Sequence, residues 1–248
     1  MAMVLLGAIL SANEDHDLGN RKKWAQQVGE PSGLTYHPSK KCLVVVGDEG
    51  QIAEISLEGE VIYLKNLGGD LEAVTADPDR KVLYAIDETS QKLLVLDWET
   101  YEILDTLGLG AIADEAGISP GGKDSFEGLV YESSKGTEPT RLWLGHQRDP
   151  VVMIPLDLEG NPLRVTPSSA IPVNLPEISD LALDPSEGDL WVVCDQEDAC
   201  FRVSRNGEIL EKRSIRGKNQ EGMVILPNGQ WWIADDSGGI FRESSPPD

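Results

Sequence analysis

Five short segments of the chain are similar to one another, and each carries a polar side chain that could bind a cation or a ligand. The shared position holds serine or glutamate, at Ser32, Glu72, Glu127, Ser179 and Glu221. If the fold gathers the three glutamates, their mutual repulsion must be relieved by raised pKa values, by water or by a cation. Carboxylate oxygens suit hard ions, so we expect Glu72, Glu127 and Glu221 to bind calcium, with magnesium as the second choice.

The spacing of the segments indicates which architecture gathers them. They recur roughly every 40 to 55 residues, close to the length of a four-stranded propeller blade. A turn, an apolar second strand and an alternating third strand follow each segment, and Glu-Gly or Asn-Gly pairs precede the outer strands. We therefore expect an all-β fold: a single five-bladed β-propeller of four-stranded antiparallel blades, with the first strand of each blade lining the axis.

The two ends of the chain together supply one repeat. The last repeat ends after its third strand, at residues 239–243, and lacks a fourth. An N-terminal strand at residues 23–28 is therefore expected to join the last blade. This divides the chain into an N-terminal segment, 1–22, and the β-propeller, 23–248. The segment could be a leader remnant or a packed strand, and residues 109–125 are expected to form a loop over one face.

The composition limits the classes of partner. The formal net charge is −22, from 21 basic and 43 acidic residues, and 40% of the residues are hydrophobic. Such a chain can bury a core, but it repels phosphate backbones and anionic lipid, so we expect no nucleic-acid partner. No stretch predicts a transmembrane span. Most of the acidic residues are expected to form a solvated surface.

A second polar ring is expected around the first, because the second strand ends on the face where the first strand begins. The candidate ligand-binding residues of both rings, beyond the three glutamates, are Ser32, Ser179, Asp180, Asp48, Glu49, Asp87, Glu88, His146, Arg148, Asp195, Asp235 and Asp236. His146 and Arg148 could orient an anionic ligand or transfer a proton. The alternative for both rings is structural: polar side chains that bind strand amides and ordered water in a wet channel.

The three cysteines leave one question open. Their odd number argues against a disulfide framework. Cys194 and Cys200 flank a turn, so they could face each other across a hairpin as a disulfide, or remain separate buried thiols.

The order of the motifs is specific. Ser-x-Leu, Leu-Glu-Ala-Val, Phe-Glu-Gly-Leu-Val-Tyr, a serine-containing fourth copy and Glu-Gly-Met occur in turn, with Ile-Asp-Glu at residues 86–88. This order resembles the SdiA-regulated family, the YjiK-like propellers, over roughly residues 24–243. The resemblance implies a bacterial β-propeller, often exported or membrane-anchored, and so favours a periplasmic or secreted location. It also implies a calcium site at the axial glutamates and no established reaction, although Gln147 and Gln196 replace glutamates common in the second ring.

Two functions follow from these expectations. The first is a calcium-binding propeller that recognises a small molecule or a protein through its acidic channel face. The alternative is a metal-dependent hydrolase, similar to the lactonase and phytase-like propellers, in which the axial ion polarises a carbonyl or phosphoryl oxygen. A third possibility is a scaffold whose channel is merely solvated.

Overall fold

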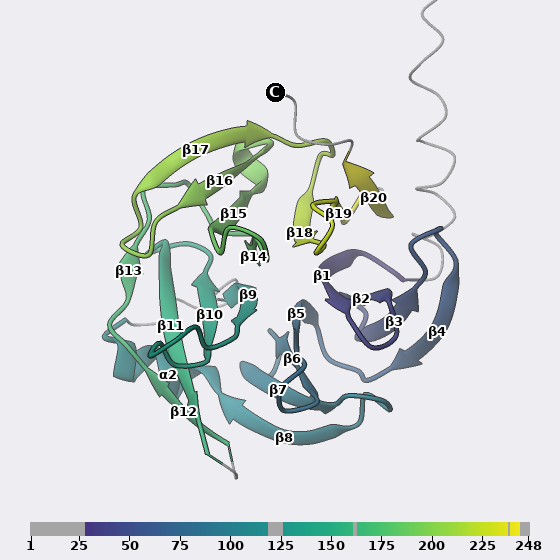
Figure 1. The fold of residues 1–248 in the computed structure, drawn as a ribbon, viewed down its shortest axis with the longest axis horizontal. Coiled ribbons are helices and arrows are strands. Elements are labelled where there is room, and N and C mark those ends of the chain that lie inside the picture. Colours follow the sequence, from purple (N-terminus) through teal and green to yellow (C-terminus); the bar gives the residue numbers. More distant parts are fainter. Residues whose placement is uncertain (1–27, 119–125, 161–162, 238, 244–248) are drawn as a thin grey trace, which may run out of the picture.

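The computed structural model describes residues 28–118, 126–160, 163–237 and 239–243. Within them the chain forms five antiparallel sheets arranged around a central axis (Figure 1). The expected all-β, five-bladed propeller is confirmed. In each sheet the strands follow sequence order from the axis outward, so every blade is a meander.

The blades have the following strands. Blade 1 comprises β1 (Pro31–His37), β2 (Cys42–Gly47), β3 (Gln51–Ile55) and β4 (Val61–Asn66). Blade 2 comprises β5 (Leu71–Asp77), β6 (Val82–Asp87), β7 (Lys92–Asp97) and β8 (Ile103–Gly108). Blade 3 comprises β9 (Phe126–Glu132), β10 (Arg141–His146), β11 (Val152–Glu159), β12 (Arg164–Pro167) and β13 (Ile171–Pro172). Blade 4 comprises β14 (Asp180–Leu183), β15 (Leu190–Cys194), β16 (Ala199–Val203) and β17 (Ile209–Ser214). Blade 5 comprises β18 (Gln220–Ile225), β19 (Trp231–Asp235) and β20 (Gly239–Glu243).

The hydrophobic core lies between the blades. Alternate residues of β2 pack on different neighbours: Val44 and Val46 contact side chains of blade 2, whereas Leu43 and Val45 contact side chains of blade 5. A second strand is therefore buried on both faces, which explains its continuous apolar sequence. The outer strands β4, β8 and β17 lie at the rim and are largely exposed (Figure 1).

The expectation of a loop at residues 109–125 is wrong for its first half. Leu109–Ala116 form the helix α2, which ends at Gly117 in the left-handed conformation with φ of 80°. Its buried residues pack between blades 2 and 3 and have helical spacing: Leu109, Ile112, Ala113 and Ala116. Gly108 and Gly110 obscure this pattern because glycine has a low helix propensity. The rest of the segment, from residue 119, lies outside the described residues.

The predicted closing strand also falls almost wholly outside the described residues. The described part of blade 5 has three strands. Val28, the last residue of the predicted strand, is 1% exposed and packs in a cluster with Leu34 of blade 1 and Trp232 of blade 5. The closure and the boundary at residue 22 stay predictions.

The cysteines are free and buried. Cys194 pairs with Ala199 across the hairpin, and Cys200 pairs with Val193, so the two cysteines are offset by one position. Adjacent positions of a ladder point to opposite faces of a sheet. The two thiols accordingly belong to different core clusters, and of the two alternatives the separate thiols hold.

Candidate cation and ligand site

The repeated polar residues all stand where the first strands begin. Glu72, Glu127 and Glu221 are each the second residue of their strand, as is Ser32, and Ser179 directly precedes β14. Each first strand contacts the first strands of both neighbouring blades, so the five form a closed ring around the axis (Figure 1). The structure therefore places the five residues on one face of the ring, which we call the acidic face.

Small residues after the motif position allow this close approach. A Cβ added to Gly33 would lie 2.6 Å from the Cα of Ala73 in the next blade. A Cβ on Gly222 would overlap the carbonyl oxygen of Ser32. The glycine of these pairs thus permits a backbone approach that a Cβ would block, directly beside the polar residue of the ring.

Burial and neighbouring carboxylates raise the pKa values of the three glutamates. Burial comes first in each case, followed by neighbouring negative charges, and together they raise the pKa of Glu127 to about 10, that of Glu72 to about 9 and that of Glu221 to about 8. Glu127 is only 8% exposed, and its Oε2 is buried without a hydrogen-bond partner among the described residues. A bound cation would both pair this oxygen and favour the ionised forms.

One compact group of carboxylates lies beside the axis. Oxygens of Asp48, Asp70 and Glu72 lie within 4.8 Å of one another. The Ser32 hydroxyl donates a hydrogen bond to Asp48, and burial raises the pKa of Asp48 to about 6. Glu127 and Glu221 are not part of this group, although the charge of Glu221 raises the pKa of Glu72. The three predicted ligands therefore do not converge on one point in the structure.

Asp70 is not among the site residues predicted from the sequence. Its signal is nevertheless present, because a polar residue precedes the motif position by two residues in every copy: Glu30, Asp70, Ser125, Glu177 and Asn219. These residues lie before the strands begin, where alternation gives no register. Only the repeat itself could have marked them.

Aspartates of the second ring accept hydrogen bonds from backbone amides. Asp87 accepts from the amide of Asp70 at 3.3 Å, and Asp195 accepts from that of Gln220 at 3.1 Å. Asp235 accepts from the amide of Lys218 at 2.8 Å. These contacts favour the structural alternative for the inner members of that ring. Glu49, Glu88 and Asp236 lie one residue further along, and the charges of Glu88 and Asp236 raise the pKa values of the axial glutamates.

Asp180 holds three blades together. Its Oδ2 accepts from the amide of Met223 at 2.8 Å and its Oδ1 from the amide of Leu129 at 3.4 Å. The carboxyl is buried, which raises its pKa. Asp180 therefore joins β14 to the first strands on both sides instead of facing a ligand, and the Ser179 hydroxyl likewise accepts from the amide of Asp195 at 3.3 Å.

His146 and Arg148 have structural partners. Arg148 Nε donates to Glu177 Oε2 at 3.0 Å, and Glu177, which is 1% exposed, also accepts from the amide of Gln196 at 2.8 Å. The His146 ring is buried, with Nδ1 2.7 Å from the carbonyl oxygen of Pro150, and burial lowers its pKa. A neutral, buried imidazole is poorly placed for proton transfer to a ligand.

The family follows from the sequence as a whole. The model of the family described as SdiA-regulated matches residues 13–223 and 163–241. The chain belongs to this family. For this SdiA-regulated protein, no helix in the described residues has the length and apolar character needed to cross a membrane.

Similar solved structures show the same fold. They include a luciferin-regenerating enzyme, with TM-score 0.55 and 12% identity over 87% of this chain and 91% of that chain. A nidogen/laminin complex gives TM-score 0.51 and 15% identity over 83% and 72%. Hydrazine synthase of Kuenenia stuttgartiensis gives TM-score 0.52 and 14% identity. The match covers 92% of this chain but only 58% of the hydrazine synthase chain. At these identities the likeness extends to the propeller fold alone.

Proposed function

We propose that this SdiA-regulated propeller binds Ca²⁺ at its acidic face and uses the bound ion to recognise a ligand, either a small molecule or a protein. The observation that carries the proposal is the buried Oε2 of Glu127, which has no hydrogen-bond partner in the described part of the chain. It lies on the same acidic face as the carboxylates of Asp48, Asp70 and Glu72, whose oxygens lie within 4.8 Å of one another. Buried carboxylate oxygens without a hydrogen-bond donor are costly unless a cation pairs with them.

The choice of ion rests on geometry and ligand type. Calcium takes six to eight oxygen ligands at about 2.3–2.6 Å, so oxygens on opposite sides of the ion lie roughly 5 Å apart. The spread within the Asp48, Asp70 and Glu72 group suits such an ion. Magnesium demands octahedral geometry at about 2.1 Å and keeps several waters, so it is the second choice.

Recognition is favoured over hydrolysis by the surroundings of the acidic ring. A hydrolase would use the same ion to polarise a substrate oxygen and would need a base or an additional cation nearby. His146 is buried against Phe126, with ring centroids 5.0 Å apart, and Arg148 is bound to Glu177. Both side chains are thus engaged by protein groups, whereas an ion with open coordination positions can accept a ligand oxygen directly.

Isothermal titration with CaCl₂ at pH 8 tests the proposal, because part of the ring is then ionised. The wild type should give heat with one dominant site, and Glu127→Gln and Glu72→Gln should each weaken binding at least about tenfold, since each removes a charged ligand. Glu58→Gln, an exposed glutamate in a hairpin turn, is the control and should bind as the wild type does. Absence of heat in the wild type would sink the proposal.

A panel of lactone, ester and phosphoester substrates then separates the two functions. The recognition proposal expects no turnover with calcium bound. Turnover that Glu127→Gln abolishes would establish the hydrolase in its place.

A further inference from the structure

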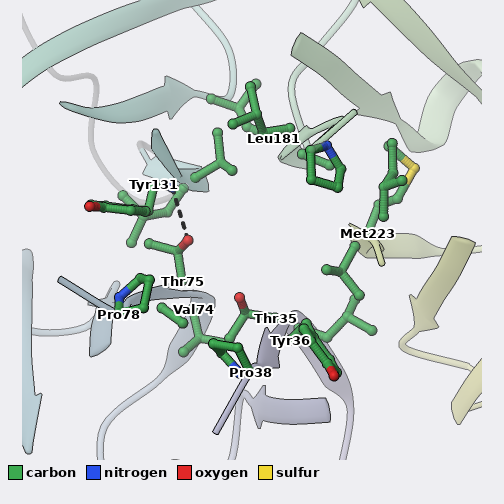
Figure 2. A pocket seen from close by; sticks show the side chains of 18 of the residues that line it. Thr35, Tyr36, Pro38, Val74, Thr75, Pro78, Tyr131, Leu181 and Met223 are labelled. Atoms are coloured by element: carbon green, nitrogen blue, oxygen red, sulfur yellow. Dashed lines mark hydrogen bonds between the residues drawn. The ribbon is translucent and has the colours of Figure 1, made fainter. Parts of the chain in front are cut away.

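The first strands end at a second, chemically different site. Their last residues and the turns that follow surround a pocket of about 300 Å³ on the axis (Figure 2). Since the acidic residues stand where these strands begin, the pocket opens on the opposite face of the propeller. Its volume lies at the lower end of the range for small-molecule sites.

A packed layer separates the pocket from the acidic face. The carboxyl of Asp180 is buried at this level, bound to the amides of Leu129 and Met223. The backbones at Gly33 and Gly222 approach their neighbours too closely to admit a Cβ. The pocket is therefore a site of its own and not the far end of an open channel.

The wall of the pocket is mainly apolar and comes from equivalent positions of the five repeats. The third motif residue of each copy lines it: Leu34, Val74, Leu129, Leu181 and Met223. Figure 2 shows Leu181 and Met223 facing Val74 across the hollow. Four prolines from the turns after β1, β5, β14 and β18 complete the wall. The sequence marks these prolines only as turn residues, so their common role becomes visible in the folded ring.

The polar groups of the pocket suit an anion. Among the described residues that line the pocket, the exposed Lys135 is the charged one and none is an aspartate or glutamate, although the chain as a whole carries a net charge of −22. The Thr35 hydroxyl points into the hollow (Figure 2), with the side chain 8% exposed and without a hydrogen-bond partner among the described residues. Thr75 beside it accepts from the amide of Tyr131 at 2.9 Å.

We propose that this pocket binds a small organic carboxylate with an apolar body. The body fills the apolar hollow, and the carboxylate remains at the rim beside Lys135. A volume of 300 Å³ corresponds to about ten water-sized groups, which matches the size of octanoate. Burial of the apolar body supplies most of the affinity, and the exposed ammonium of Lys135 selects the sign of the charge.

Methionine methyl NMR tests the site directly. The chain has four methionines, of which Met223 lines the pocket and Met153 is buried in the core between blades 3 and 4. With ¹³C-methyl methionine, titration with octanoate should shift the Met223 signal, assigned through Met223→Leu, and leave that of Met153 unchanged. Octylammonium and acetate should bind much more weakly, because each lacks one of the two features that the pocket recognises.

A matched pair of lysine variants tests the charge. Lys135→Gln should weaken octanoate binding about three- to fivefold, the worth of an exposed ion pair of up to about 1 kcal/mol. Lys92→Gln, an exposed lysine at the start of β7 towards the acidic face, should bind octanoate as the wild type does. The proposal is overturned if octanoate leaves Met223 unshifted at millimolar concentration, if octylammonium binds equally well, or if Lys135→Gln has no effect.

Discussion

The two faces of the propeller are built from the same five strands, yet they carry opposite chemistry. At the start of the first strands, Glu72, Glu127 and Glu221 have raised pKa values, and Glu127 has one buried oxygen to which no described residue donates a hydrogen bond. At the end of the same strands, the pocket lining is mainly apolar, and its described residues include no carboxylate. A first strand that runs from one face of the propeller to the other can therefore place acidic residues at one end and apolar residues at the other.

Asp180 explains how the two chemistries coexist. It replaces the small residue of the other four copies, and its carboxyl bonds to the amides of both neighbouring first strands. The fourth repeat thus carries serine at the motif position on the acidic face and places a carboxyl inside the separating layer. The repeats are equivalent in backbone but differ in chemical role.

The largest expected effect is a dependence of the free energy of unfolding on pH, which follows from the acidic face and not from the apolar pocket. Without a cation the axial glutamates titrate near pH 8 to 10 in the folded protein, against an ordinary value of 4.5. The folded state then binds more protons than the unfolded chain, so the free energy of unfolding falls as pH rises from about 5 to 8. Each group contributes up to about 1.4 kcal/mol per pH unit, and we expect a total loss of roughly 3 kcal/mol or more.

Urea unfolding between pH 5 and pH 8 measures this loss, first with EDTA and then with saturating calcium. Calcium should restore most of the stability at pH 8, since it binds the ionised, folded ring. Glu127→Gln should flatten the profile in EDTA because one titrating group is gone. A free energy of unfolding that is constant or rises with pH in EDTA would contradict the proposed electrostatics of the acidic face.

The next effect concerns the separating layer. Asp180→Ala leaves the amides of Leu129 and Met223 without their acceptor inside the ring, which we expect to cost about 2–4 kcal/mol of the free energy of unfolding. Asp180→Asn keeps an acceptor oxygen and should cost clearly less. Urea denaturation of both variants gives the difference. An alanine variant as stable as the wild type would remove Asp180 from its role between the faces.

The smallest effect is a matched pair of hydroxyl deletions. Ser32→Ala on the acidic face removes a hydrogen bond to Asp48 and should cost about 1 kcal/mol of stability. Thr35→Val, three residues along the same strand in the apolar pocket, removes a hydroxyl without a partner among the described residues and should change stability by less than about 0.5 kcal/mol. If thermal denaturation shows equal losses of stability in the two variants, the hydroxyls on the two faces do not differ in their hydrogen bonding.

The sequence predicts the fold better than the site. The interval between the repeated motifs and the apolar second strands together predict the five blades, because each repeat must bury its apolar surface against the next. The helix α2 was not predicted because Gly108 and Gly110 interrupt the helical spacing of its apolar residues. Its apolar spacing appears only when Leu109 and Ala116 are considered together.

Residues outside the strand register were harder to predict. The ring positions of Glu72, Glu127 and Glu221 follow from their equivalent places in the repeat. Asp70 and Glu177 lie before the strands, where no period fixes their direction, and their contacts with Asp48 and Arg148 depend on the folded loops. The apolar pocket could not be predicted from the sequence for a different reason: its side chains have the composition of an ordinary hydrophobic core.

The most direct test of the central claim is an anomalous difference map from crystals of the wild type grown at pH 8 with CaCl₂. The account predicts a peak on the acidic face, within coordination distance of Glu72 and at least one further carboxylate of the ring. The peak should be lost in crystals of Glu127→Gln or displaced towards Asp48 and Asp70. An acidic face without a peak at saturating calcium, in crystals that show the ring side chains clearly, would contradict the account.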